Sequence, residues 1–331
     1  MTARIPLTLA CGDYDRTRAI QDGRVQVEGC DVTYLPLEPE EIFHRAFKHQ
    51  EFDACELSFS SYLRTVDAGT SPYIGIPAFV SRIFRHSGIY VRTDRGIRTP
   101  QDLKTRLIGL PEYQITAVVW LRGLMQDEYG VKPTDIRWRQ GGIEEPGRTE
   151  RTPLKPIPGL DLKPLPPEKT LSGALESGEL DAVFSARAPS CFTRGAPNVG
   201  RLFPDYRAVE KEYYKKTGMF PIMHLIGLKR EIAAAHPWLP ASLYKAFCQA
   251  KTYAMRDVRE VNALMITLPW LVAEADETAK LMGEDFWRYG VRENAAEIEA
   301  LTRYSFEQGL VQRKLRFEDL FPPSVIEVSK I

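Results

Sequence analysis

The stretch LESGELDAVF, residues 175–184, joins a helix to a buried strand through a single glycine. Residues 169–177 predict a short helix, and Gly178 ends it because glycine readily adopts the left-handed conformation of a helix C-cap. Asp181 then opens the apolar run 181–184, which predicts a buried strand. The strand leads into SARAP, residues 185–189, so the segment predicts one helix–strand unit of an α/β protein.

The same alternation runs through the N-terminal part of the chain. Apolar runs at 7–11, 32–37 and 52–57 predict strands, and residues 40–49 predict a helix with one apolar face. Strands that alternate with helices in this way form largely parallel sheets. The sequence therefore predicts an α/β fold.

The alternation of predicted helices and strands begins again at Thr99, which is followed by Pro100 and Asp102 in the pattern of a capped helix start. Two extended stretches, 74–91 and 222–228, flank the restarted part and predict two crossings between two lobes. We therefore expect lobe 1 to comprise residues 1–91 and 224–331, with a helical C-terminal tail, and lobe 2 to comprise residues 92–223.

Residues 144–168 carry seven prolines. Prolines at that density sustain neither a helix nor a central strand, because proline lacks the backbone N–H. We interpret the segment as an extended excursion within lobe 2. It is expected either to pack on a partner subunit or to form a solvated loop.

Composition excludes several classes of protein. The 331 residues contain 44 Lys and Arg against 44 Asp and Glu, and a nucleic-acid binder needs a surplus of positive charge. No stretch approaches the roughly 18 apolar residues of a membrane span. The five cysteines are widely spaced without a CxxC pair, which favours a reducing compartment over a disulfide framework or a structural zinc site. The N-terminus lacks a secretory pattern, so a cytoplasmic protein is expected.

Particular stretches resemble known proteins. LESGELDA and residues 99–109 resemble elements of the type II periplasmic-binding-protein fold, in which two lobes joined by two crossings hold a small ligand. Five further stretches resemble the 4,5-dihydroxyphthalate decarboxylase family: FVSRIFRHS (79–87), GLPEYQITA (109–117), GGIEEPGR (141–148), FSARAP (184–189) and FPIMH (220–224). The resemblance implies a carboxy-lyase that releases CO2 from a dihydroxylated phthalate to give protocatechuate, without an organic cofactor.

That reaction sets requirements on the site. A bare aryl carbanion is very unstable, but a deprotonated hydroxyl para to the carboxyl lets the ipso carbon accept a proton before the C–C bond breaks. The site then needs a proton donor at that carbon, an acceptor for the hydroxyl, and a clamp for the other carboxylate.

Arginine suits the clamp, because its guanidinium matches a carboxylate with two hydrogen bonds. We expect Arg82, Arg85 and Arg187 in this role, at strand ends or crossings. CO2 leaves as a neutral molecule, so an arginine on the leaving carboxylate would stabilise the ground state and slow the reaction. The arginines are therefore expected on the carboxylate that stays, with the leaving group against less polar side chains such as Phe84, Tyr113 or Phe220. Surface or inter-lobe ion pairs are the alternative role for each arginine.

Two of the five histidines lie next to the predicted crossings. We assign His86 as the proton donor and His224 as the partner of the ring hydroxyls, and an exchange of these roles is the alternative. A hydrogen-bonded structural role is the other alternative for both. His44, His49 and His236 are expected to be structural or solvated.

Other groups are expected to hold the substrate's oxygens. Helix starts present free N–H groups to anions, and four hydroxyl residues lie at such starts: Ser58, Ser60, Ser61 and Thr116. Tyr113 precedes one of these helices, and Asp13 and Tyr14 follow the first strand, where they are expected to contact ring hydroxyls. Plain helix capping is the alternative for the hydroxyl residues.

No cofactor is expected. HxH, HExxH and nucleotide-binding glycine motifs are absent, although a metal assembled from His86, His224 and Glu112 stays an alternative.

Two competing functions stay open. A solute-binding protein would share the fold and bind a similar carboxylate without turnover, and another biosynthetic enzyme could use the same scaffold. A homo-oligomer, dimer or tetramer, is expected. Its interface would come from the C-terminal tail with Trp270, Trp287 and Tyr289, residues that otherwise belong to the core.

Overall fold

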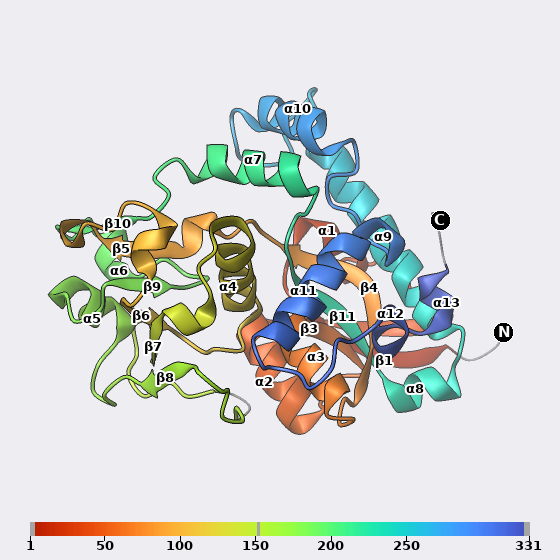
Figure 1. Cartoon of the computed structure of the whole chain (residues 1–331). Coiled ribbons are helices and arrows are strands. Elements are labelled where there is room, and N and C mark those ends of the chain that lie inside the picture. The colour runs from red at the N-terminus through yellow and green to blue at the C-terminus, as the bar shows by residue number, and fades with distance from the viewer. Residues whose placement is uncertain (1–3, 151–152, 328–331) are drawn as a thin grey trace. The chain divides into compact units, whose positions relative to one another are not determined.

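The computed structural model describes residues 4–150 and 153–327. The chain divides into two compact units (Figure 1). The first contains the chain up to Arg82, residues 217–299 and the chain from Leu315 onward, and the second contains residues 83–216 and 300–314. The C-terminal tail thus contributes to both units. The lobe limits expected at 91/92 and 223/224 stay a prediction.

A five-stranded sheet, in the order β2-β1-β3-β11-β4, forms the centre of the first unit. Its strands are β1 (Ile5–Cys11), β2 (Cys30–Pro36), β3 (Ala54–Ser58), β4 (Tyr73–Arg82) and β11 (Ile222–Lys229). β1 pairs in parallel with β2 and β3, whereas β11 runs antiparallel to β3 and β4. This returning strand places His224 opposite Ser58, the last residue of β3.

The helices of the first unit lie between its first strands and in its helical C-terminal tail. They are α1 (Asp15–Gln21), α2 (Pro39–His49), α3 (Phe59–Asp67), α8 (Arg230–Ala235), α9 (Leu239–Asp257), α10 (Leu271–Met282), α12 (Phe317–Leu320) and α13 (Pro323–Ile326). α2 buries Ile42, Phe43 and Ala46 on one face, as its sequence pattern predicts. A further helix, α11 (Ala295–Glu307), begins in the first unit and ends in the second.

The second unit contains a six-stranded sheet in the order β10-β5-β9-β6-β7-β8. Its strands are β5 (Ile89–Arg92), β6 (Leu107–Leu110), β7 (Arg137–Gln140), β8 (Asp161–Pro164), β9 (Ala182–Phe184) and β10 (Val199–Arg201), and its helices are α4 (Thr116–Tyr129), α5 (Leu171–Ser177), α6 (Ser190–Thr193) and α7 (Tyr206–Thr217). β9, β6, β7 and β8 are mutually parallel, so their carboxyl ends meet at one edge. Ligand sites of parallel sheets form at that edge.

The stretch 175–184 folds as its sequence predicts. α5 ends at Ser177, Gly178 takes a φ of 80°, and β9 follows with all three residues buried. The start at Thr99 also has its predicted capping box with Asp102, but the helix that follows is a short 3-10 turn, Pro100–Leu103. The turn ends at Leu103, and Thr105, with a φ of 64°, directs the chain into β6, which begins at Leu107.

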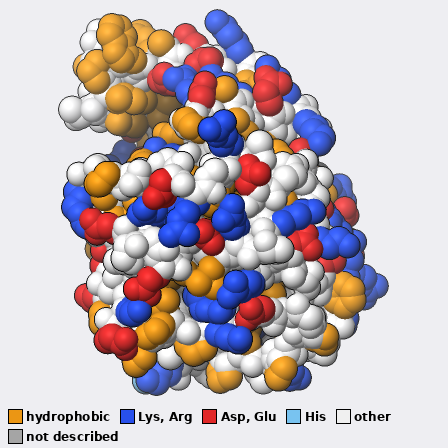
Figure 2. Space-filling view, turned by 60° about the vertical axis from the view of Figure 1, so that its left-hand side comes forward, with side chains coloured by type: hydrophobic (Ala, Val, Ile, Leu, Met, Phe, Trp, Pro, Cys, Tyr) orange, Lys and Arg blue, Asp and Glu red, His pale blue; other side chains and the backbone are white. Residues whose placement is uncertain are grey.

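The proline-rich segment 144–168 contains β8, which pairs with β7 at the edge of the sheet. Its terminal Pro164 is tolerated because an edge strand has no partner on its far side. Within the described residues, no helix is long and apolar enough to cross a membrane. Figure 2 shows acidic and basic side chains interspersed over one face, in agreement with the balanced composition.

Candidate functional site

A buried carboxylate lies at the centre of one group of predicted residues in the first unit. Glu56 comes from β3, whose five residues are all buried, and its side chain is fully inaccessible to solvent. Oε1 of Glu56 lies 2.5 Å from Nδ1 of His224 and accepts a hydrogen bond of 2.9 Å from the hydroxyl of Tyr14. Oε2 accepts the backbone N–H of Gly12 at 3.0 Å. Residues of β3, of β11 and of the turn after β1 therefore meet at one carboxylate.

Charge and burial oppose each other at Glu56. Burial alone would raise the pKa of this carboxyl, but the hydrogen bonds and charge of His224, with those of Gly12 N–H and Tyr14, outweigh burial and lower the pKa below its usual value. Glu56 is therefore ionised at neutral pH. Burial raises the pKa of Tyr14 well above its usual range, so this phenol stays protonated and donates to Glu56.

His224 combines a fixed orientation with partial access to solvent. Its side chain is 19% exposed, and Phe43 packs edge-on against the ring with centroids 4.8 Å apart. An anionic Glu56 fixes the hydrogen on Nδ1, which leaves Nε2 as the nitrogen that can exchange a proton with another molecule. This is the arrangement of a histidine oriented by a carboxylate for acid–base chemistry.

The other residues predicted in the first unit have different surroundings. Ser58 ends β3 and precedes α3, and its hydroxyl accepts a hydrogen bond of 3.3 Å from Ser61. Ser60 is fully buried in the first turn of α3. Asp13 is exposed and pairs with Arg18 at 3.2 Å. Tyr14, by contrast, donates its hydroxyl to Glu56.

Arg82, expected to clamp substrate, directs its hydrogen bonds to protein groups. Its guanidinium is 1% exposed and donates to the carbonyls of Phe220 at 2.9 Å and Arg288 at 3.0 Å. It also contacts the side chains of Asn294 and Glu297. Burial lowers the pKa of Arg82 to about 10, with Glu297 raising it in part. These contacts hold three segments of the first unit together.

His86 in the second unit is enclosed by aromatic rings. Its ring centroid lies 5.4 Å from that of Phe203 and 5.3 Å from that of Tyr213. Neither ring nitrogen has a hydrogen-bond partner among the described residues, and Nδ1 lies 3.8 Å from Oε1 of Glu210. Burial lowers the pKa of His86 to about 4, so this imidazole is neutral at neutral pH.

The neighbours of His86 are also buried ionisable groups. Burial raises the pKa of Glu210 to about 7, although the N–H groups of Ser87 and His86 and the charge of Arg85 lower it in part. Burial likewise lowers the pKa of Arg85 to about 10. This part of the second unit thus keeps His86 neutral and brings the pKa of Glu210 close to neutral pH.

The carboxyl edge of the second sheet carries the remaining predicted residues. Tyr113 and Thr116 follow β6 and are buried, and Thr116 begins α4. Arg187 follows β9 and is exposed, with its backbone N–H bonded to the Ser185 hydroxyl at 3.1 Å. No hydrogen bond or ion pair of its guanidinium is found within the described residues. Arg187 therefore has the most accessible charge of the three predicted arginines.

Sequence reasoning missed Glu56. The signal was available, because Glu56 is an acidic residue in the middle of the buried strand 54–58, directly before the serine-rich helix start. It also missed Arg122, which lies in α4 with 1% exposure and whose guanidinium carbon is 3.5 Å from the Tyr113 ring centroid.

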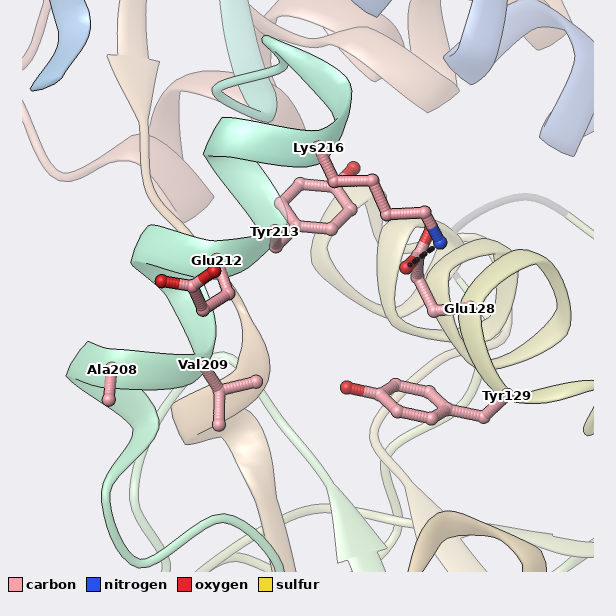
Figure 3. Close-up of a pocket in the computed structure, with 7 residues that line it drawn as sticks. All are labelled: Glu128, Tyr129, Ala208, Val209, Glu212, Tyr213 and Lys216. Carbon is pink, nitrogen blue, oxygen red and sulfur yellow. Dashed lines mark hydrogen bonds and ion pairs between the residues drawn. The ribbon is translucent and has the colours of Figure 1, made fainter.

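A separate pocket of about 330 Å³ lies between α4 and α7 (Figure 3). Tyr129 and Val209 face each other across it, and Lys216 bonds to Glu128 at 2.7 Å on its rim. None of the predicted site residues lines this pocket. Within the part of the chain that the structure describes, no three His, Cys, Asp or Glu side chains are grouped so as to hold a metal ion.

The two α/β units, each with its parallel strands and one reversed strand, have a type II periplasmic-binding-protein-like fold. The periplasmic aliphatic sulphonate binding protein of Escherichia coli has the same fold, with a TM-score of 0.53 at 14% identity over 97% of this chain and 99% of that one. No family model matches the chain. The fold shared with the Escherichia coli protein confirms the fold class predicted from the sequence.

Two relatives identify the family. A 4,5-dihydroxyphthalate decarboxylase of Comamonas testosteroni is 46% identical over 329 residues, which cover 99% of this chain and 100% of that protein. A protein of the same name from Pseudomonas putida is 49% identical over 212 residues, which cover 64% of this chain and 82% of that protein. The chain belongs to the 4,5-dihydroxyphthalate decarboxylase family and is a carboxy-lyase. The resemblance seen in the sequence is confirmed.

Proposed function

We propose that this chain converts 4,5-dihydroxyphthalate to protocatechuate and CO2, without oxidation, by protonating the ring carbon that carries the leaving carboxylate. The observation that carries the proposal is the Glu56–His224 pair, with 2.5 Å between Oε1 and Nδ1. The names of the two relatives supply the substrate, and the pair supplies a proton donor held in one orientation.

In this scheme His224 delivers the proton to the ring. The para hydroxyl of the substrate is present as a phenolate and pushes electrons into the ring, while protonated His224 gives H⁺ from Nε2 to the ipso carbon. The C–C bond then breaks, its electron pair returns to the ring, and CO2 leaves as a neutral molecule. The product regains its hydroxyl proton, His224 takes a proton from solvent, and the net change is one H⁺ consumed for each CO2 released.

Glu56 and Tyr14 position His224 in this scheme. The Glu56 carboxylate fixes the orientation of the His224 ring through Nδ1, and the Tyr14 hydroxyl and the Gly12 N–H hold the carboxylate in place. Burying an ionised pair is energetically expensive. A protein that only binds a carboxylate has no need of such a pair, and this favours turnover over a solute-binding function.

The donor role moves from His86, the first assignment from the sequence, to His224. His86 is neutral in its aromatic enclosure and has a depressed pKa, which makes it a poor source of a proton. We assign the donor role to His224 and a packing role to His86. Ser58, Ser60 and Ser61 remain candidates for the substrate's oxygens.

Arg187 is the proposed clamp for the carboxylate that stays on the ring. Its guanidinium is exposed at the carboxyl edge of a parallel sheet, where it can form two hydrogen bonds to a carboxylate. Arg85, Tyr113 and Thr116 are proposed to contribute to the same anion site. The leaving carboxylate is not held by arginine in this scheme, because its charge disappears during the reaction.

A cytoplasmic homo-oligomer, a dimer or tetramer, completes the proposal. All five cysteines are free, as in a reducing compartment. The exposed hydrophobic residues between α9 and α10, among them Val261, Met265 and Trp270, offer a surface for a second copy. Light scattering on the purified protein measures the assembly directly.

Purified protein incubated with 4,5-dihydroxyphthalate tests the function. We expect CO2 and protocatechuate in equal amounts, and the same rate after treatment with a chelator. Binding of the substrate without product would leave the solute-binding alternative, and loss of turnover on chelation would contradict the metal-free scheme.

A further inference from the structure

The turn that follows β6 already holds a carboxylate that comes from the chain itself. The backbone N–H of Tyr113 donates a hydrogen bond to Oε1 of Glu150. The N–H and side chain of Gln114 also stabilise the ionised form of Glu150 and oppose the rise in its pKa that burial causes. Glu150 belongs to the proline-rich excursion 144–168, so a distant segment of the second unit supplies this anion.

A buried cation lies beside the same turn. Arg122 of α4 is 1% exposed, donates to the Tyr113 carbonyl at 2.6 Å and to Gln308 at 2.8 Å, and stacks on the Tyr113 ring. Its Nη1 has no hydrogen-bond partner among the described residues, and neither do the Tyr113 hydroxyl and Oε2 of Glu150. A buried guanidinium with an unused N–H is a binding group for an anion.

The excursion supplies a second charged contact to this turn. Arg148 donates to Oε1 of Glu112 through Nε at 3.0 Å and through Nη2 at 2.7 Å, and Glu112 is 1% exposed. Glu112 and Tyr113 are adjacent in the chain, so Arg148 and Glu150 contact neighbouring residues of the turn.

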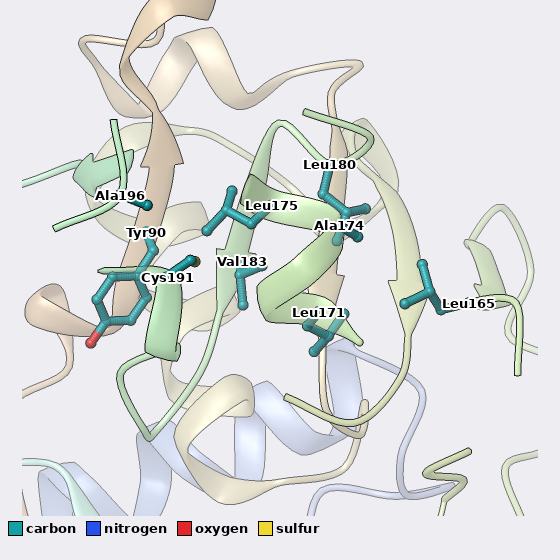
Figure 4. Close-up of a cluster of buried hydrophobic side chains, with 9 residues drawn as sticks. All are labelled: Tyr90, Leu165, Leu171, Ala174, Leu175, Leu180, Val183, Cys191 and Ala196. Atoms are coloured by element: carbon teal, nitrogen blue, oxygen red, sulfur yellow. The ribbon is translucent and has the colours of Figure 1, made fainter. Parts of the chain in front are cut away.

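Both ends of the excursion are anchored in the core of the second unit. Leu165 belongs to a buried cluster with Leu171, Leu175 and Val183 (Figure 4), and Ile143 packs against the same cluster. The segment between these anchors is thus held close to the carboxyl edge of β6 and β7, where Leu110 pairs with Gln140. Its carboxylate is present at that edge at a high effective concentration.

We propose that Glu150 is an internal competitor for the substrate: its carboxylate occupies the anion position at Tyr113 and Gln114 that a carboxylate of the aromatic ligand takes when it binds. This inference rests on the proposed function for the class of ligand. Substrate binding requires Glu150 to leave, and Arg122 then faces the ligand's carboxylate in its place. Glu150 therefore sets the affinity that an anion must exceed in order to displace it. It disfavours anions that carry a single weak hydrogen-bond acceptor.

The size of the effect follows from the fraction of molecules that are ready to bind. The apparent dissociation constant equals the intrinsic constant divided by that fraction. If Glu150 occupies the position in about nine molecules of ten, its removal tightens binding about 10-fold.

The test measures binding of phthalate, which has both carboxylates but none of the hydroxyls that turnover needs. Calorimetry on wild type, Glu150→Gln and the control Glu145→Gln compares a contacting carboxylate with an exposed one on the same excursion. We expect about 10-fold tighter binding for Glu150→Gln and no change for Glu145→Gln. Unchanged or weaker binding by Glu150→Gln, or no binding by any of the three proteins, overturns the proposal.

Two further measurements are made. The first asks whether the reach of the Glu150 carboxylate matters, and the second separates this inference from the proposed function. Glu150→Asp keeps the charge but retracts it by one methylene, and it should tighten binding less than Glu150→Gln does; it also replaces Glu150→Gln if that variant does not fold. Turnover of 4,5-dihydroxyphthalate is assayed on the same samples. Absence of turnover with a 10-fold gain in phthalate affinity contradicts the proposed function alone, and normal turnover with unchanged affinity contradicts this inference alone.

Discussion

Replacement of Glu56 by glutamine tests how the acid–base pair works. The substitution keeps the size and shape of the side chain but removes its charge and changes one acceptor oxygen into an NH2 group. Glu56 accepts hydrogen bonds at both oxygens, from Gly12 N–H at 3.0 Å and from the Tyr14 hydroxyl at 2.9 Å, besides its contact with His224. A glutamine can satisfy only one of these two sides, so at least one donor loses its partner.

The magnitude follows from these contacts. Hydrogen bonds to a charged group contribute about 1.5–3 kcal/mol each, and breaking a buried ion pair destabilises by about 3–5 kcal/mol. We expect Glu56→Gln to lower the free energy of unfolding by about 3 kcal/mol, which a domain of ordinary stability survives. Loss of the orienting charge should lower kcat about 100- to 1,000-fold, within the range of acid–base catalysis.

The pH dependence has a definite sign. The folded pKa of Glu56 lies below its unfolded value, so its stabilisation is present above the unfolded pKa and disappears as the pH falls through the folded pKa. The difference in Tm between wild type and Glu56→Gln should therefore be largest near neutral pH. It should shrink as the pH falls below about 4.

Protocatechuate formation and thermal unfolding measure the two effects, and Asp53→Asn is the matched control. Asp53 immediately precedes β3 and accepts hydrogen bonds from the Thr8 N–H at 2.8 Å and the Thr8 hydroxyl at 2.7 Å. The control should lose stability and keep kcat. If Glu56→Gln keeps kcat within about twofold, Glu56 does not orient the proton donor and the reasoning fails.

Four other substitutions have expected outcomes. His224→Gln should lower kcat about 100-fold, whereas His86→Gln should lower it less than about 5-fold; the opposite order in a rate assay returns the donor role to His86. Arg187→Ala should raise KM about 10-fold through a lost charge-assisted contact, with kcat nearly unchanged; an unchanged KM places the clamp elsewhere. The folded pKa of Glu210, about 7, lies above its unfolded value, so wild type loses stability as the pH rises from about 4.5 to 7. Glu210→Gln should escape this loss and be about 2 kcal/mol more stable at pH 8 in denaturant unfolding, and a variant no more stable than wild type at that pH would contradict the burial argument.

The sequence predicts much of the fold because its local signals agree with one another. Gly178 predicts the end of a helix and Asp181 the start of a strand, and in the structure α5 ends and β9 begins there. In the first 67 residues the predicted strands and helices correspond to β1, β2, β3, α2 and α3, whereas the sequence pattern does not predict α1 (Asp15–Gln21). The capped start at Thr99 yields only a 3-10 turn, because residue 105 already turns the chain toward β6.

The candidate site is harder to predict because its contacts join residues far apart in the chain. His224 could be proposed from the sequence, but its partner Glu56 lies 168 residues earlier and is brought to it by the antiparallel register of β11 on β3. Burial is equally hidden. His86 is enclosed by Phe203 and Tyr213, and nothing in the neighbouring sequence reveals that enclosure.

The central claim is that a proton from the protein reaches the ring carbon that loses its carboxylate. The most direct measurement is turnover of 4,5-dihydroxyphthalate in D2O, followed by NMR of the protocatechuate. The scheme predicts one deuterium at the carbon that carried the lost carboxyl group, with one CO2 released per deuterium. Product without deuterium at that carbon, or deuterium spread over the ring, would contradict the claim.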